Sequence, residues 1–173
     1  MARTLRMRRS QTAASGMLLV LLGVWGGLIP FIGPYFHYAY TPDKAWDYTT
    51  ARLWLEILPG AAAFVGGALL VTARGRMAAA FGAALAAAAG AWFTLGTVLS
   101  PLWNHGLPLG GTPAGTTVAL RIAEQLGFFT GLGVVIVALA ALAFGHATAW
   151  PVVMGSRTLV DDDDAEVTEP ISR

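Results

Sequence analysis

The stretch LWLEILPGAAAFVGGALLVTARGRMAAAFGAALAAAAGAWFTLGTVL, residues 53–99, contains two apolar runs separated by Arg74 and Arg76. Each run has about the 20 apolar residues that an α-helix needs to cross the hydrocarbon core of a bilayer. The few residues around the two arginines leave room only for a tight turn. The stretch therefore predicts two antiparallel helices that both cross a membrane.

Similar apolar runs lie on both sides of this helix pair. Of the 173 residues, 55% are hydrophobic and only 12% are charged, and the mean hydropathy is +0.61. These values are typical of a chain whose main solvent is lipid. The expected spans are residues 16–32, 53–73, 77–99 and 122–144. We therefore predict an all-α, polytopic membrane protein, a four-helix transmembrane bundle over residues 16–147.

The two ends of the chain differ from the bundle in composition and from each other in charge. Residues 1–15 are basic and polar, whereas residues 148–173 include the acidic run 161–164. Neither segment can bury enough apolar surface to fold alone. We expect a basic cytoplasmic tail against anionic lipid headgroups, and an acidic, disordered cytoplasmic tail.

The positions of the arginines predict the orientation of the spans. Cytoplasmic loops retain more Lys and Arg than translocated loops do. Basic residues precede the first span, fill the turn at 74–76 and follow the fourth span at Arg157. We therefore expect both termini in the cytoplasm and the loops 33–52 and 100–121 outside. The first span is followed by no small-residue cleavage site, which indicates an uncleaved anchor in the cell membrane.

Small residues recur at four-residue spacing in every expected span. Lipid tails are as apolar as leucine, so membrane helices associate through close backbone approach and polar contacts. The small-residue sets are Gly23 and Gly27; Ala63 and Gly67; Gly82, Ala86 and Gly90; and Gly127 and Gly131. They predict faces that pack within the bundle or against another protein.

Several rare residues of the first half recur in the same order about 68 residues later. The matched pairs are Trp25 and Trp92, Pro34 and Pro101, His37 and His105, Thr41-Pro42 and Thr112-Pro113, Thr49-Thr50 and Thr116-Thr117, Arg52 and Arg121, and Glu56 and Glu124. The pattern predicts two tandem copies of a two-helix hairpin, with chance matches in a biased composition as the alternative. Two such copies would be related by a pseudo-two-fold axis along the bilayer normal.

Two glutamates lie inside the expected spans, each close to an arginine. Glu56 follows Arg52 by four residues and Glu124 follows Arg121 by three, so each pair lies on one helix face near the outer surface. An acidic side chain within a span is costly unless it is paired. Two interpretations stay open: a four-charge clasp that only sets helix register, or an outward-facing site for an ion, a proton or a polar headgroup.

His37 and His105 are candidates to join the glutamates in this binding site. Their spacing matches no metal motif, so we expect no metal, and no haem or other cofactor. The absence of cysteine excludes disulfides, iron-sulfur clusters and thiol chemistry. The sequence has no nucleophile constellation, phosphate loop or nucleic-acid-binding surface. An enzyme and a nucleic-acid partner are therefore not expected.

The two expected outer loops differ in composition. The first is rich in the aromatic residues that favour a membrane interface, and Thr41 is placed to cap a short helix beginning at Pro42, with Asp43 in its first turn. The second is rich in glycine and proline, which predicts an irregular chain until about Thr116.

The pattern GPYFHYAYTPDKAWDYTTARLWLEILPGAAAFVGG at 33–67, followed by LRIAEQLGFFTGLG at 120–133, resembles small four-helix integral membrane proteins of high-GC actinobacteria. The resemblance covers residues 16–144 and implies a bacterial inner membrane, but that group has no assigned activity. We expect a non-catalytic component of the lipid bilayer that packs against a membrane protein partner or its own copies. The alternative is a binding or transport site centred on Glu56 and Glu124.

Overall fold

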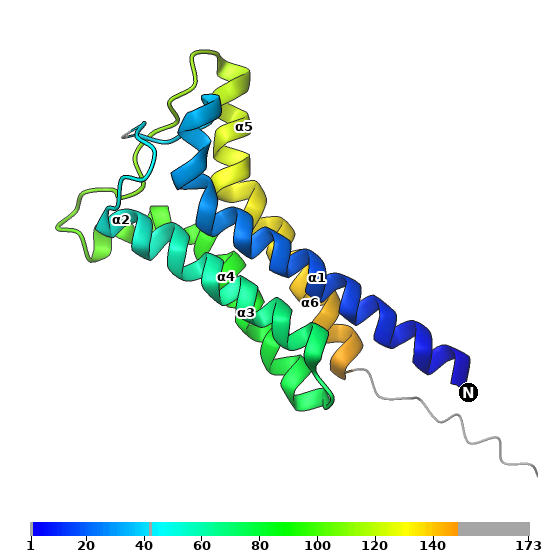
Figure 1. Ribbon diagram of the computed structural model, residues 1–173. Coiled ribbons are helices and arrows are strands. Elements are labelled where there is room, and N and C mark those ends of the chain that lie inside the picture. The colour runs from blue at the N-terminus through cyan, green and yellow to red at the C-terminus, as the bar shows by residue number, and fades with distance from the viewer. Residues whose placement is uncertain (1, 42, 149–173) are drawn as a thin grey trace, which may run out of the picture.

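The computed structural model describes residues 2–41 and 43–148, which form helices joined by one tight turn and two long loops (Figure 1). The elements are α1 (Ala2–Ile32), the 3-10 turn η1 (Gly33–Phe36), α2 (Thr50–Arg52), the π-helical turn η2 (Leu53–Ile57), α3 (Leu58–Thr72), α4 (Arg76–Leu99), the 3-10 turn η3 (Ser100–Leu102), α5 (Val118–Phe128) and α6 (Thr130–Thr148). The expected acidic tail from residue 149 onward lies outside the described residues.

Four helical stretches are long and apolar enough to cross a membrane. They are Gln11–Phe36, Thr50–Thr72, Arg76–Leu102 and Val118–Thr148. The predicted all-helical fold with four candidate spans is therefore confirmed. The basic N-terminal segment differs from our expectation, because α1 already begins at Ala2. Extending an existing helix costs less than nucleating one, since each added residue also adds a hydrogen bond.

The second and fourth candidate spans are not continuous α-helices, which the sequence analysis did not anticipate. In the second span, the N–H of Leu58 bonds to the Leu53 carbonyl across the π turn. Pro59 follows and has no N–H to donate, so the regular hydrogen-bond pattern of an α-helix is already interrupted at this residue. In the fourth span, Phe129 has φ −128° and ψ −81°, which separates α5 from α6. Both interruptions lie near the end of the bundle that carries the long loops.

Close backbone contacts join the helices in pairs: α1 packs on α3, α3 on α4, and α4 on α6. A Cβ atom added to Gly23 would lie 2.5 Å from the backbone nitrogen of Phe64, and one at Gly90 would lie 2.8 Å from the Gly133 carbonyl oxygen. Only glycine permits this approach. Most of the predicted small-residue faces therefore lie inside the bundle, although a Cβ at Gly27 would meet nothing within 4 Å.

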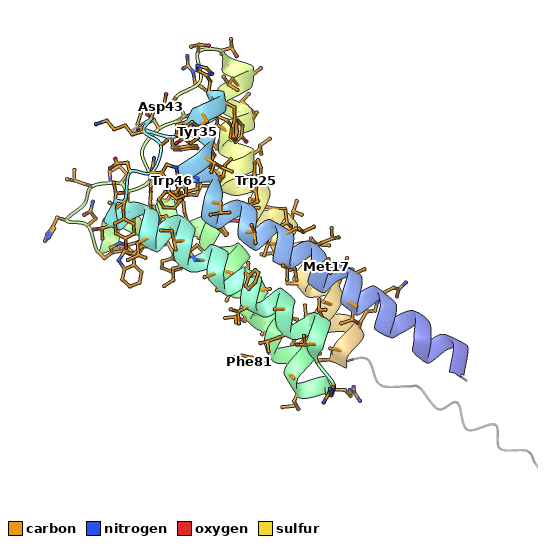
Figure 2. The ribbon with its side chains drawn as sticks, viewed as in Figure 1. Met17, Trp25, Tyr35, Asp43, Trp46 and Phe81 are labelled. Atoms are coloured by element: carbon orange, nitrogen blue, oxygen red, sulfur yellow. The ribbon has the colours of Figure 1, made fainter. Side chains whose placement is uncertain are left out.

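Large apolar side chains cover the outside of the bundle, as expected for a surface solvated by lipid. Met17 and Phe81 are 53% and 63% exposed, and Figure 2 shows them on different helices along the bundle. Tyr35, Asp43 and Trp46 gather instead at the end with the long loops. We call this end, which comprises residues 33–52 and 100–121, the loop end.

The two long loops pair with each other at the loop end. They run between two parts of the bundle, one formed by α5 with the end of α1, and the other formed by the ends of α3 and α4 (Figure 1). Tyr40 and Pro113 form an antiparallel bridge, flanked by a hydrogen bond of 3.0 Å from the Thr41 N–H to the Thr112 carbonyl. The Thr112 N–H donates to the Thr41 hydroxyl at 2.9 Å. The expected helix after Thr41 is therefore wrong: residues 43–49 are not helical, because this threonine bonds the other loop instead of capping.

The opposite end of the bundle is closed by an arginine. The Arg76 guanidinium donates to the carbonyls of Ala147 at 3.0 Å and Thr148 at 2.9 Å. Ala147 and Thr148 are the last described residues of α6, and the last carbonyls of a helix need partners from outside it. A cation there also interacts favourably with the helix dipole. The basic turn that the sequence analysis used as a topology signal thus also anchors the last helix.

Candidate functional site

Thr49 and Thr117 begin the second and fourth spans in the same way. Each threonine side chain accepts a hydrogen bond of 3.2 Å from the backbone N–H three residues later, at Arg52 and Leu120. Glu56 and Glu124 each follow their capping threonine by seven residues. At the rise of a helix, both carboxylates lie about 10 Å along their spans. The structure thus places the two predicted glutamates at equivalent positions.

Glu124 binds the backbone of both long loops. Its side chain is fully buried. Its Oε1 accepts a hydrogen bond from the Ala39 N–H at 3.3 Å, and its Oε2 accepts one from the Gly115 N–H at 2.9 Å. The Ala39 carbonyl in turn accepts from the Ala114 N–H at 3.0 Å, within the paired loops. Glu124 therefore has a structural task, which is to hold the paired loops onto α5.

The two candidate arginines also bind loop backbone, at matching places. Arg52 donates from Nη1 to the Asp47 carbonyl at 2.6 Å, and Arg121 donates from Nε to the Gly115 carbonyl at 2.9 Å. Asp47 and Gly115 each lie two residues before the capping threonine. Arg121 and Glu124 thus share Gly115, one taking its carbonyl and the other its N–H. These contacts clasp the loops to the helices.

Arg52 is more deeply placed than Arg121. Its side chain is 6% exposed, donates a second hydrogen bond to the Lys44 carbonyl at 3.3 Å, and lies over the Phe31 ring at 5.9 Å from the ring centre. An aromatic face stabilises a guanidinium at such a distance. The first loop is therefore fastened by a buried cation, whereas the second is fastened by an exposed one.

Glu56 differs from Glu124 in its hydrogen bonding. It is 3% exposed, yet its Oε2 has no hydrogen-bond partner. A buried polar atom without a partner costs about 1–3 kcal/mol, and more when the group is charged. Glu56 also lies in the π turn η2, and such turns occur frequently at functional sites. The arrangement leaves a carboxylate oxygen available inside a candidate membrane span.

His37 and His105 lie elsewhere. Both residues are exposed and adopt left-handed backbone conformations, with φ of 57° and 51°. The structure therefore does not place the imidazoles with the buried carboxylates. Across residues 2–41 and 43–148, no group of three or more His, Cys, Asp and Glu side chains is arranged to hold a metal ion.

Tyr40 is a site residue that the sequence pattern does not single out, because it lies in a loop rich in aromatic residues expected at the membrane interface. Only 8% of it is exposed, and its ring packs against Phe128 and Phe129, with ring centres 5.1 Å apart in each case. Burial, together with the nearby charges of Glu124, Tyr38 and Glu56, raises the pKa of the Tyr40 hydroxyl to about 12. This tyrosine lies within the electrostatic field of both glutamates. No local sequence signal distinguishes it from the exposed tyrosines around it.

Two tryptophans of the predicted repeat each bond a backbone carbonyl of another helix. The Trp25 indole in α1 donates to the Gly127 carbonyl in α5 at 3.1 Å, and the Trp92 indole in α4 donates to the Trp54 carbonyl in η2 at 2.8 Å. In each case the first helix of one predicted copy bonds the second helix of the other. The two acceptors differ in position, since Trp54 follows Thr49 by five residues and Gly127 follows Thr117 by ten, and the tandem repeat stays a prediction.

No protein-family model matches the chain, and searches of curated proteins and of solved structures found no match either. The resemblance to actinobacterial membrane proteins therefore stays a prediction. The geometry around Glu56 is the basis for a function.

Proposed function

We propose that this chain is a membrane protein that binds a proton reversibly at Glu56, near the outer surface of the membrane. The observation that carries the proposal is the buried Oε2 atom without a hydrogen-bond partner in a candidate membrane span. Ionisable groups within membrane spans are costly and mark functional sites by default. A bound proton removes the charge that burial penalises.

A proton fits this site better than a metal ion does. A divalent cation takes several oxygen or nitrogen ligands, and the described residues offer no such group around Glu56. A proton needs only the carboxylate, so the site can bind it without further ligands.

The role expected from the sequence, packing against a membrane protein partner or a second copy, has less support. It depended on small residues that face outward. Gly23, Gly67, Gly82 and Gly90 instead approach the backbone of neighbouring helices within the chain. Gly27, where an added Cβ would meet nothing, and the larger apolar side chains that cover the bundle stay available to a partner.

The proton site can be tested by infrared difference spectroscopy of the protein in nanodiscs at acidic and alkaline pH. Glu56→Gln is expected to remove one protonated-carboxyl band from the spectrum of the folded protein. Glu124→Gln, at the equivalent position, is the control and should keep that band. A Glu56→Gln spectrum identical to that of the parent would refute the proposal. Loss of the band in Glu124→Gln instead would show that the protonated carboxyl group is Glu124, and would refute it too.

We also propose that both termini and the turn at residues 73–75 lie in the cytoplasm and the loop end outside, from the arginine distribution. The chain has no cysteine, so single cysteines can be introduced without background. A membrane-impermeant thiol reagent added to intact cells is expected to label Asp47→Cys and to leave Gly75→Cys unlabelled until the membrane is opened. Labelling of Gly75→Cys in intact cells would reverse the topology.

A further inference from the structure

A cavity of about 260 Å³ opens at the loop end, beside the break between α5 and α6. Four of its lining residues carry uncharged polar side chains: Tyr40, Thr97, Gln125 and Thr130. They come from the first loop, α4, α5 and α6, so the cavity exists only in the folded bundle. Its volume lies just below the roughly 300–1,000 Å³ typical of small-molecule pockets. It suits a small ligand or one headgroup of a larger one.

The lining combines uncharged polar side chains with apolar residues. No Asp, Glu, Lys, Arg or His lines the cavity. Tyr40, with its pKa raised to about 12, stays a neutral hydroxyl at physiological pH. Hydroxyl groups both donate and accept hydrogen bonds, and an amide side chain offers two donors and one acceptor atom. This set matches an uncharged ligand that carries several hydroxyls.

Two of these polar groups are available to a ligand. Among the described residues, neither the Tyr40 hydroxyl nor the Gln125 amide makes a hydrogen bond, although Tyr40 is 8% exposed. Gln125 is exposed within the candidate span Val118–Thr148. In lipid no water satisfies an exposed amide, so it remains costly without a hydrogen-bonding ligand.

The surroundings of the cavity are suited to a lipid. Val98, which also lines the cavity, is 72% exposed on the outer face of α4. Leu95, one turn earlier on the same helix, is 50% exposed. A headgroup in the cavity would thus have an apolar surface beside it for acyl chains.

We propose that this cavity binds an uncharged polyhydroxyl group, such as the sugar or glycerol headgroup of a neutral lipid or the corresponding free sugar. The cavity supplies hydroxyl and amide partners to the ligand, while Leu109 and Phe129 supply apolar wall. This site is separate from the proton site and does not require proton binding at Glu56.

The test is native mass spectrometry of the purified full chain with monoglucosyl-diacylglycerol. We expect retention of this lipid in preference to phosphatidylglycerol, whose charged phosphate has no partner in the cavity. Tyr40→Phe and Gln125→Leu should each weaken binding about tenfold, the value of one lost hydrogen bond. Tyr48→Phe, on the same loop but outside the cavity, is the matched control and should bind as the parent does. Tyr40→Phe keeps the ring that packs against Phe128, so folding is retained.

Competition by free glucose separates the two sources of the ligand. Displacement of the lipid by glucose would support recognition of the sugar itself, and retention would support a lipid ligand with the same headgroup chemistry. Equal binding of phosphatidylglycerol, or unchanged affinity in both Tyr40→Phe and Gln125→Leu, would overturn the proposal. Glu56→Gln is expected to keep the lipid, so failure of the proton site would leave this result unaffected.

Discussion

Replacing Glu124 by alanine is expected to lower the free energy of unfolding by about 3 kcal/mol and to loosen both long loops. The change removes the acceptor of the Ala39 and Gly115 amides, and each buried amide left without a partner costs about 1–3 kcal/mol. The free energy can be measured by titrating the protein from mild detergent into a denaturing detergent. Amide hydrogen exchange at Ala39 and Gly115 would report the loops directly.

Glu56→Ala is the matched control for this experiment. It removes the same side chain at the equivalent position of the other span, and so leaves a space of similar size. Because Oε2 of Glu56 has no partner, we expect Glu56→Ala to be less destabilising than Glu124→Ala by about 2 kcal/mol. Equal losses in the two variants would show that bulk, and not loop binding, is the contribution of Glu124.

Gly23→Ala is expected to destabilise the bundle by about 1–3 kcal/mol, as overpacking does in a tight core. The new methyl group would lie 2.5 Å from the Phe64 nitrogen and 2.7 Å from the Gly60 oxygen. Both atoms belong to the backbone of α3, so the two helices must separate. The same detergent titration measures the loss.

Gly27→Ala, one turn further along α1, is the control, because its Cβ would meet nothing within 4 Å. It should be neutral or slightly stabilising, since alanine favours helix more than glycine does. If Gly27→Ala were as harmful as Gly23→Ala, the first helix would need glycine for its flexibility, and the close approach of α1 and α3 would not be the reason.

Sequence patterns predicted the helical elements well because their causes are local. About 20 consecutive apolar residues suffice to indicate a membrane-spanning helix, and the spans around Leu19, Ala63, Ala86 and Ile136 all follow from such runs. Glu56 and Glu124 were likewise recognised from their rarity within apolar sequence. Small-residue spacing predicted contact faces without identifying the helix that each face would meet.

Other features depend on residues far apart in the chain. Thr41 had the sequence context of a helix cap, yet its hydroxyl accepts a hydrogen bond from Thr112. Tyr40 has the same sequence context as the exposed aromatic residues near it, and its burial comes from the contacts with Phe128 and Phe129. Neither of these outcomes has a signal in the adjacent sequence.

Composition and residue pattern are enough to predict four spans, of which the second and the fourth begin with a threonine, an arginine and a glutamate. Folding brings the two long loops to Glu124 and leaves an oxygen of Glu56 without a hydrogen-bond partner. The physical reason is that span formation depends on local apolar length, whereas satisfying a buried carboxylate depends on which distant amides reach it. The amides of Ala39 and Gly115 both donate to Glu124. Glu124 is therefore satisfied by the loops, whereas Oε2 of Glu56 has no hydrogen-bond partner.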